Sequence, residues 1–215
     1  MPPRAISDEQ KQERQQNILD TAWTMFQETD YSTVTMAGIA ERLGLAKGTI
    51  YLYFPTKEEL FLAITMEQLA GWFREMDGRL DEIEAISPAQ LAQTIMQSLA
   101  VRPDLVRLLA ILSTVLEQNV RYEAAYTFKQ RLGLHLTQTG ERLEDRVASP
   151  GGGTVLPRGA GARFLLRLHA LIVGLRHLSA PSPVVRQVLS APEMQGYAVD
   201  FDAELSAIIL ALLQG

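Results

Sequence analysis

Apolar side chains recur along this chain mostly three or four residues apart, and no stretch alternates apolar and polar positions for more than a few residues. That spacing places apolar groups on one face of successive helices, as with Ile18, Ala22 and Phe26. Ser7 and Gln10 have the spacing of a capping box that would open this first helix. The pattern therefore predicts an all-α protein.

Capping signals predict three more helices in the first third of the chain. Residues 35–43 form a short apolar segment that ends at Gly44, and residues 46–53 form another. Thr56 with Glu59 three positions later is a second capping box, which predicts a helix running to about residue 80.

The rest of the chain also has helical spacing. Residues 105–116 are apolar at nine of twelve positions, which is typical of a helix buried on most sides. Residues 121–146 have an amphipathic pattern, and the glycine-rich and proline-rich segment 149–161 predicts a loop. Two apolar helices are expected at 162–179 and 201–213, with prolines interrupting the segment between them.

Composition excludes several classes of site and location. The chain has no cysteine, which excludes disulfides and thiolate metal sites. His169 and His177 lie eight residues apart, not at the four-residue spacing of a helical metal pair, so we expect no metal and no cofactor. No apolar run reaches the ~18 residues that a membrane span needs, and the first fifteen residues are too polar for a signal peptide. We therefore expect a soluble cytoplasmic protein without a membrane partner.

The charge balance argues against nucleic-acid binding through a broadly basic surface. The formal net charge is −5, and residues 1–60 alone carry −3. Any binding to DNA must therefore rest on a few placed cations and on oriented hydroxyl and backbone donors.

Residues 35–54 nevertheless have the proportions of a helix-turn-helix. In the second of these helices Ile50 is the apolar anchor, and the opposite arc is centred near Gly48. A glycine there permits close approach to a DNA groove, and Lys47 beside it can reach a base edge. The spacing alone fits two interpretations equally well: a DNA-reading helix, or a tight helical corner in which the tyrosines are packing residues.

A longer match separates these interpretations. The ordered segment AWTMFQETDYSTVTMAGIAERLGLAKGTIYLYFPTKEELF, residues 22–61, resembles the DNA-binding domain of the TetR family of bacterial transcriptional regulators, which would occupy about residues 11–61. The resemblance implies a three-helix helix-turn-helix DNA-binding domain (1–60) followed by a larger helical effector and dimerisation domain (61–215). By the same resemblance, Lys47 and Gly48 would face bases. The residues expected at phosphates or at the helix start beside them are Thr35, Thr49, Tyr51, Tyr53 and Lys57.

Three positions depart from the family pattern. Ala37 stands where an arginine is frequent, Gly38 weakens its helix by up to ~1 kcal/mol relative to alanine, and Ala46 replaces a frequent capping serine. These departures bear on affinity and operator choice more than on the fold.

The resemblance also implies a ligand pocket and a dimer face in the second domain. Candidate pocket residues, although side chains of this kind are more often plain core, are Met66, Phe73, Met96, Leu112, Leu116, Tyr122, Tyr126 and Phe128. Candidate interface residues from the last two long helices are Phe164, Leu168, Leu171, Leu175, Leu205, Ile208, Ile209 and Leu212.

The function predicted from these features is that of a ligand-responsive transcriptional regulator, not an enzyme. It would be a homodimeric repressor that a small hydrophobic effector, not identified by the sequence, releases from a palindromic double-stranded DNA operator. One alternative is an effector-independent or activating DNA-binding protein whose second domain binds a protein partner or only dimerises. Another is an enzyme with a helical corner, against which the absence of a recognisable catalytic set of residues argues.

Overall fold

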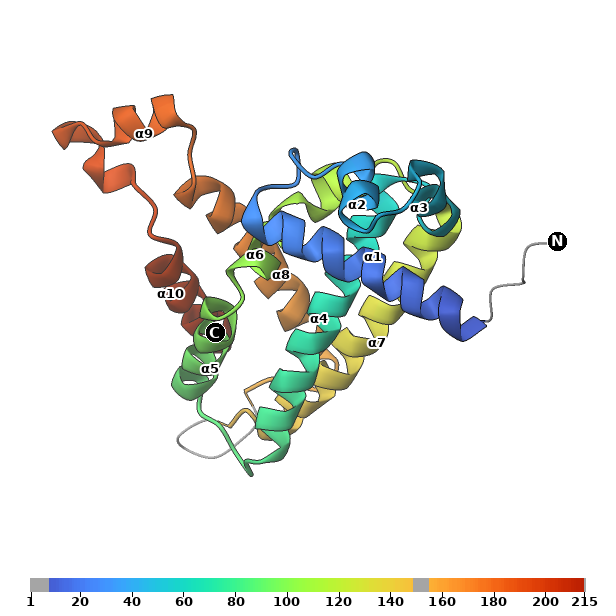
Figure 1. Cartoon of the computed structure of the whole chain (residues 1–215). Coiled ribbons are helices and arrows are strands. Elements are labelled where there is room, and N and C mark those ends of the chain that lie inside the picture. The colour runs from blue at the N-terminus through green and yellow to red at the C-terminus, as the bar shows by residue number, and fades with distance from the viewer. Residues whose placement is uncertain (1–7, 149–154, 215) are drawn as a thin grey trace, which may run out of the picture.

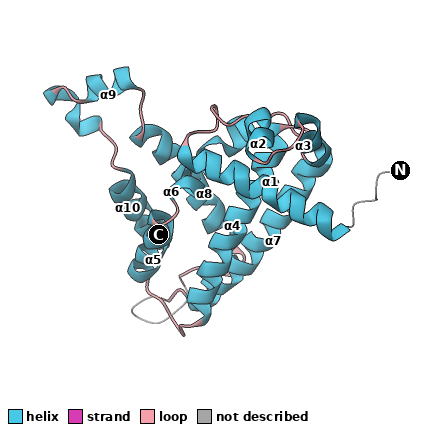
Figure 2. Ribbon diagram, in the orientation of Figure 1, coloured by secondary structure: helices cyan, strands magenta, loops and turns pink. Residues whose placement is uncertain are grey.

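The computed structural model describes residues 8–148 and 155–214, and these are organised entirely around helices (Figures 1 and 2). Within this part of the chain the sole β-type pairing is an isolated bridge between Ile86 and Val147. The predicted all-α fold is thus confirmed, although Ser7 of the first predicted capping box lies outside the described residues. In chain order the elements are α1 (Asp8–Glu28), α2 (Met36–Arg42), α3 (Lys47–Tyr53), α4 (Lys57–Asp81), α5 (Pro88–Ala100), α6 (Pro103–Ile111), the π-helix η1 (Leu112–Leu116), α7 (Tyr122–Arg146), α8 (Ala160–Ser179), α9 (Pro183–Leu189), the 3₁₀-helix η2 (Pro192–Tyr197) and α10 (Phe201–Gln214).

Local capping sets α2 and the turn that follows it. Thr35 caps α2, because its Oγ1 accepts a hydrogen bond from the backbone N–H of Gly38 at 3.0 Å. Gly44 ends this helix with a positive φ of 64°, a conformation that glycine adopts without strain. The chain can then turn sharply into α3, whose Ile50 is fully buried against the same core as Ile39.

Helix α4 connects the two parts of the molecule. It has 25 residues, and its N-cap Thr56 accepts a hydrogen bond from the N–H of Glu59 at 3.1 Å, as the sequence predicts. It packs against α1, α7, α6 and η1. In Figure 1 it runs from beneath the helix-turn-helix to the far end of the second bundle.

The apolar segment predicted as one helix over 105–116 is two elements. α6 starts with Pro103 at its first turn, and the backbone widens into η1, where Glu117 N bonds to Leu112 O at 3.0 Å. A π-turn shifts the register of the following side chains, so Leu116 remains fully buried while Ser113 lies at the surface.

Helices α7 and α8 make the closest contact in the bundle through two glycines. A Cβ added at Gly161 would collide with the carbonyl group of Gly140, and one added at Gly140 would lie 2.5 Å from the backbone N of Ala162. The buried Glu144 carboxylate accepts a hydrogen bond from Gly161 N at 2.7 Å, which ties the first turn of α8 to α7.

Beyond α8, residues 180–200 form an arm that extends away from the bundle (Figure 1). α10 then returns to pack on α5 and α8. The sequence pattern showed only proline breaks here. The structure instead uses Pro183 and Pro192 in the first turns of α9 and η2, where a missing N–H costs nothing. Neither short helix has a buried residue.

Candidate functional site

Helix α3 presents one face to solvent. Ile50 points inward, whereas Lys47 and Gly48 are exposed, and Tyr51 retains 41% of its accessible surface. No described atom outside the local backbone lies within 4 Å of a Cβ added at Gly48. Packing within the chain therefore gives no reason for glycine at this position, which leaves space for a close approach from outside.

The remaining residues predicted to contact DNA are engaged within the chain to different degrees. Thr49 and Tyr53 are half-buried, and Tyr53 packs against the core. The hydroxyl of Thr35 is occupied as the cap of α2.

Lys57 lies differently from its predicted position at a phosphate. Its Nζ donates a hydrogen bond to the backbone carbonyl of Tyr31 and lies 3.9 Å from the centre of the Tyr31 ring. Burial lowers the pKa of the Lys57 ammonium, while the carboxylates of Glu58 and Asp30 act to raise it. The ammonium thus fastens the start of α4 to the turn between α1 and α2, a long-range contact that local sequence spacing does not reveal.

A second contact, not foreseen from the sequence, joins α4 to the segment before α7. The Glu59 side chain is buried, and its two carboxylate oxygens accept hydrogen bonds from Arg121 Nε at 2.8 Å and from Arg121 NH2 at 2.7 Å. The Arg121 backbone N–H adds a third bond at 3.0 Å. These hydrogen bonds lower the pKa of the Glu59 carboxyl, against the opposing effect of burial.

Asn119 extends this connection, which we name the latch (residues 119–121 with Thr56, Glu58 and Glu59). Thr56 Oγ1 donates to the Asn119 carbonyl at 3.0 Å, and Asn119 Nδ2 donates to Glu58 at 3.2 Å. The latch holds the N-terminus of α4 to the chain that leaves η1.

Arg107 of α6 makes a separate contact with the first helix. Its guanidinium pairs with Asp104 at 2.8 Å, donates to the Thr29 carbonyl at 2.5 Å and stacks 4.4 Å from the centre of the Phe26 ring. Arg107 therefore attaches α6 to the end of α1. The latch attaches the chain that leaves η1 to the start of α4.

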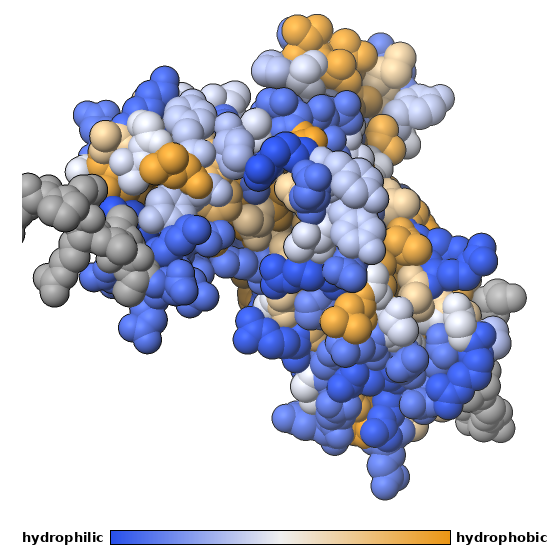
Figure 3. Space-filling model, turned by 90° about the vertical axis from the view of Figure 1, so that its right-hand side faces the viewer, coloured by the Kyte–Doolittle hydropathy of each residue, from blue (hydrophilic) through white to orange (hydrophobic). Residues whose placement is uncertain are grey.

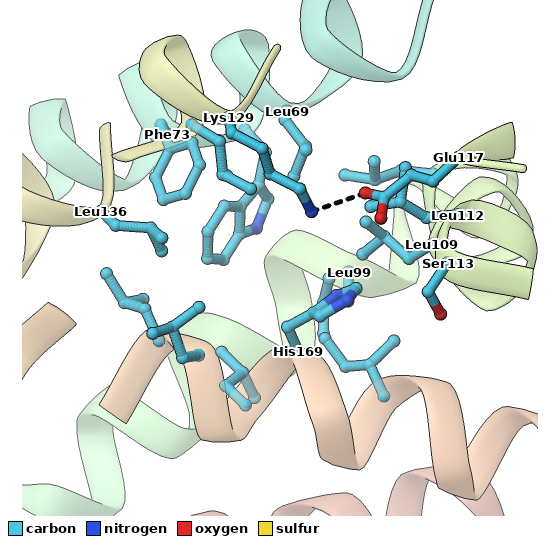
Figure 4. A pocket seen from close by; sticks show the side chains of 17 residues that line it. Leu69, Phe73, Leu99, Leu109, Leu112, Ser113, Glu117, Lys129, Leu136 and His169 are labelled. Carbon is cyan, nitrogen blue, oxygen red and sulfur yellow. Dashed lines mark hydrogen bonds and ion pairs between the residues drawn. The ribbon is translucent and has the colours of Figure 1, made fainter. Parts of the chain in front are cut away.

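A cavity of about 140 Å³ lies in the second bundle, between α4, α5, α6, η1, α7 and α8. Most of its wall is apolar, and Figure 4 shows Phe73 and Leu136 at one end. The lining residues are Leu69, Trp72, Phe73, Leu99, Leu105, Leu109, Leu112, Ser113, Glu117, Lys129, Leu132, Leu136, Leu165, Leu166, Leu168, His169 and Ile172.

Polar groups gather at the other end of this cavity (Figure 4). Lys129 Nζ pairs with Glu117 Oε1 at 2.6 Å, and Ser113 and His169 lie on the same side. Burial lowers the pKa of His169, the Lys129 ammonium lowers it further, and the Glu117 carboxylate opposes both. The imidazole is therefore neutral at neutral pH.

The structure separates the predicted pocket residues. Phe73 and Leu112 line the cavity, whereas Met66 and Phe128 line a second hollow of about 310 Å³ beside the Glu59–Arg121 pair. Leu116 is core, and Met96 is half-buried outside both hollows.

Tyr122 and Tyr126 correct the prediction that they line a pocket. They are 75% and 56% exposed and stack on each other with ring centres 5.9 Å apart. Their spacing of four residues puts them on one face of α7, but that face points to solvent. Sequence reasoning also missed Lys129 and His169, whose helical spacing is that of ordinary surface or core positions.

The dimer face predicted on the last two long helices also needs correction. Within the chain α8 packs on α7 and α6, and α10 packs on α5 and α8. Five of the eight predicted interface side chains are consequently buried in the single chain and offer a partner little surface: Phe164, Leu168, Leu175, Leu205 and Ile209. The other three, Leu171, Ile208 and Leu212, are half-buried. The exposed apolar side chains of this region are Leu166, Leu178, Val184, Val185, Val188, Met194 and Tyr197.

The side of the molecule seen in Figure 3 is mostly hydrophilic, with apolar residues in separate patches. In the described ranges no helix combines the length and hydropathy required to cross a membrane. Nor does this part of the chain bring three or more His, Asp or Glu residues together as a metal site.

Comparison with known families accounts for both halves of the molecule. Residues 18–64 match the family described as bacterial regulatory proteins, tetR family, and residues 66–215 match the tetracyclin repressor-like, C-terminal domain. The chain belongs to the TetR family of bacterial transcriptional regulators. The resemblance seen in residues 22–61 is thereby confirmed, and the curated relatives are transcriptional regulators.

Individual relatives are similar to only part of the chain. The fatty acid metabolism regulator protein of Bacillus subtilis (strain 168) is 31% identical over 86 residues, which are 40% of this chain and 44% of that protein. The HTH-type transcriptional repressor KstR of Rhodococcus jostii (strain RHA1) is 31% identical over 94 residues, 44% of this chain and 42% of that protein. The chain thus spans less than half the length of these curated relatives that it matches.

A solved structure shows the shared TetR-family fold over nearly the whole chain. It is that of a possible TetR family transcriptional regulator from Streptomyces coelicolor A3(2), with a TM-score of 0.55 and 17% identity. The superposition covers 94% of this chain and 97% of that one.

Proposed function

We propose that this TetR-family regulator is a homodimeric repressor that a small, largely apolar effector releases from a palindromic operator. Residues 1–60 would bind DNA in the bacterial cytoplasm, and residues 61–215 would bind the effector and the second subunit. The observation that carries the proposal is the continuity of one short segment. Leu112, Ser113 and Glu117 line the cavity, and residues 119–121 of the same segment form the latch on α4.

This continuity supplies a physical route for coupling. Leu112 and Ser113 form part of the cavity wall, Glu117 closes its polar end, and Arg121 follows four residues later. A ligand that repositions Glu117 must also move or strain the backbone that holds Glu59. It can shift the equilibrium between DNA-binding and released conformations by its difference in affinity for the two.

The DNA contacts in this proposal come from the exposed face of α3. Lys47 would read a base edge, and Gly48 would let the backbone approach the groove. Thr49, Tyr51 and Tyr53 would contact phosphates, with the N-terminus of α2 at Thr35 nearby. Lys57 would position α4 through Tyr31 in place of its predicted phosphate contact.

A palindromic operator requires two recognition helices, and hence a symmetric pair of chains. We assign the interface to the exposed face of α8 together with the arm. Leu166 and Leu178 on α8 are 52% and 59% exposed, and Val184 on the arm is 71% exposed. These groups, unlike the buried residues predicted from periodicity, are free to bind a second subunit.

The arm also favours a second candidate function, that of a regulator controlled by a protein partner. An exposed apolar arm is a surface that either a second copy or another protein would cover. In that case the protein would bind DNA but no small molecule would change its affinity.

Footprinting on the DNA upstream of the protein's own coding sequence, followed by fluorescence anisotropy on the protected segment, tests the proposal. We expect protection of a two-fold symmetric site, and release by at least one compound from a library of small apolar molecules. Operator binding that no compound weakens would favour the partner-controlled alternative. Absence of DNA binding under all salt conditions would contradict both.

A further inference from the structure

The cavity described above has a size and a polarity that restrict what it can hold. Its volume of about 140 Å³ resembles that of an apolar cavity of about 150 Å³ that accommodates benzene. It is therefore matched to a single ring or to a short branched chain. Phe73 and Leu136 lie at the apolar end, where a ring would sit.

The charges at the polar end cancel. Lys129 and Glu117 form one ion pair, and the half-buried His169 beside them is neutral at neutral pH because burial lowers its pKa. A ligand with a net charge would have to draw one partner of this pair away and leave the other without its counter-charge. The Glu117 side chain is only 23% exposed, against 57% for Lys129, so the main cost of breaking the pair is an unpaired Glu117 carboxylate. A neutral ligand leaves the pair intact.

At the same end of the cavity, some side-chain hydrogen-bond donors and acceptors have no partner within the described chain. Within the described chain, no hydrogen bond engages the Ser113 hydroxyl or either ring nitrogen of His169, and both residues line the cavity. Lys129 has two further N–H donors beyond the one that Glu117 accepts. A single hydroxyl group can donate to His169 or Glu117 and accept from Lys129 or Ser113.

We propose that the cavity binds neutral alcohols and phenols of about one ring in size, with the hydroxyl at the Lys129–Glu117 pair and the ring against Phe73 and Leu136. This inference rests on the proposed function, because it names the chemical class of the effector that the cavity receives. The ligand's hydroxyl would contact Glu117 directly, at the end of the segment that continues into the latch.

Isothermal titration calorimetry of the full-length protein without DNA tests the inference. Five probes of similar size separate the effects of the ligand's hydroxyl group and of its net charge: phenol, cyclohexanol, toluene, benzoate and benzylammonium. We expect phenol and cyclohexanol to bind, and toluene, benzoate and benzylammonium to bind about tenfold or more weakly. Equal or tighter binding of either ion to the unsubstituted protein overturns the proposal, and so does failure of all five probes to bind.

Substitutions at the polar end test the charge argument. Lys129→Met leaves the Glu117 carboxylate alone and should shift the preference toward benzylammonium, whereas Glu117→Gln should shift it toward benzoate. His169→Phe should weaken phenol binding but leave toluene binding unchanged. Unaltered preferences in all three variants would contradict the assigned position of the hydroxyl.

A matched pair on α7 tests the position of the ring. Leu136→Trp should fill the apolar end and abolish phenol binding, whereas Leu134→Trp, at a 57% exposed position outside the lining, should not. Circular dichroism establishes that each variant is folded. Undiminished phenol binding by folded Leu136→Trp would contradict the assignment, and if that variant does not fold, His169→Phe still decides.

The outcome is independent of the operator experiment. Phenol binding without release of operator DNA would retain this inference and contradict the proposed release mechanism. Operator release by other compounds, with no binding of phenol or cyclohexanol, would retain the mechanism and overturn the inference.

Discussion

Glu59 and Arg121 lie 62 positions apart in the sequence, yet they form a two-pronged ion pair at the start of α4, with Nε–Oε1 and NH2–Oε2 distances of 2.8 and 2.7 Å. The carboxylate is buried, whereas the guanidinium remains largely accessible to water. The pair joins the segment leaving the cavity wall to α4, the helix that follows α3 in the chain.

Replacing Arg121 should therefore affect both stability and coupling. In Arg121→Ala the buried Glu59 carboxylate loses its charged partner, so we expect the unfolding midpoint at pH 7 to fall by several degrees. Effector-induced release from operator DNA should weaken, because the latch is broken. Thermal denaturation and anisotropy measure the two effects, and Arg74→Ala, an exposed substitution on α4, serves as control. Unchanged release would exclude the latch as the route of coupling.

The contact between Gly140 and Gly161 predicts opposite effects for two glycines of α8. Gly161→Ala would force a Cβ into the α7 backbone, and we expect a loss of roughly 1–3 kcal/mol in unfolding free energy. Gly174→Ala has no described atom within 4 Å of the added Cβ and should be neutral or stabilising by up to about 1 kcal/mol. Urea denaturation of both variants gives the comparison. Equal effects would mean that the two helices separate at little cost.

Substitutions on α3 should distinguish sequence reading from general affinity. Lys47→Ala should lose roughly 1–3 kcal/mol of discrimination between the operator and a scrambled duplex. Tyr51→Phe should weaken both duplexes about equally, since phosphate contacts carry no sequence information. Fluorescence anisotropy on the two duplexes measures each affinity. Full discrimination by Lys47→Ala would leave α3 as a structural corner.

Lys57→Ala tests the inward orientation of this ammonium. Loss of the Tyr31 carbonyl and ring contacts should destabilise the protein by about 1 kcal/mol. If Lys57 stays inward on DNA, the salt dependence of operator binding should not change. A decrease in slope of about one unit per half-site would instead show that Lys57 binds a phosphate in the complex.

The half-buried His169 should make stability depend on pH. Its folded-state pKa is lowered from the ordinary 6.5, mainly by burial and also by Lys129, with Glu117 opposing. The unfolded chain then binds the proton more tightly, so the folded state loses stability as pH falls below about 6.5. Burial lowers the pKa of His135 in the same direction.

His169→Phe should accordingly reduce the decrease in unfolding midpoint between pH 7.5 and 5.5, values chosen to lie about one pH unit on either side of 6.5. The exposed His177→Phe is the control. A pH dependence that is identical in the two variants and in the unsubstituted protein would exclude His169 as a contributor.

The features that could be predicted from sequence are those that depend on neighbouring residues. The caps at Thr35 and Thr56 and the turn at Gly44 are set by side chains within three or four positions, and each lies where the pattern indicates. The inward position of Ile50 follows from helical periodicity in the same way.

The features that could not be predicted depend on packing between distant segments. The inward position of Lys57 is set by Tyr31, 26 positions away in the chain. The widening of the helix at Leu112 has no signal in the apolar pattern of the segment. The predicted dimer face with Leu168 and Leu205 shows a different limit. Apolar periodicity indicates that a helix face is buried, but not whether a partner subunit or the same chain buries it. Here Leu168 and Leu205 are buried by other helices of the same chain.

The length of α4 has a geometric consequence. From Lys57 to Phe73 the helix spans about 24 Å at 1.5 Å per residue, with the recognition helix beside one end and the cavity beside the other. The helix is therefore a lever: a tilt of about 5° at Phe73 would displace its far end by about 2 Å. In the proposed symmetric pair the two displacements would add or subtract along the DNA axis, so a tilt of this size would change the separation of the two α3 helices by a sizeable part of one base-pair step.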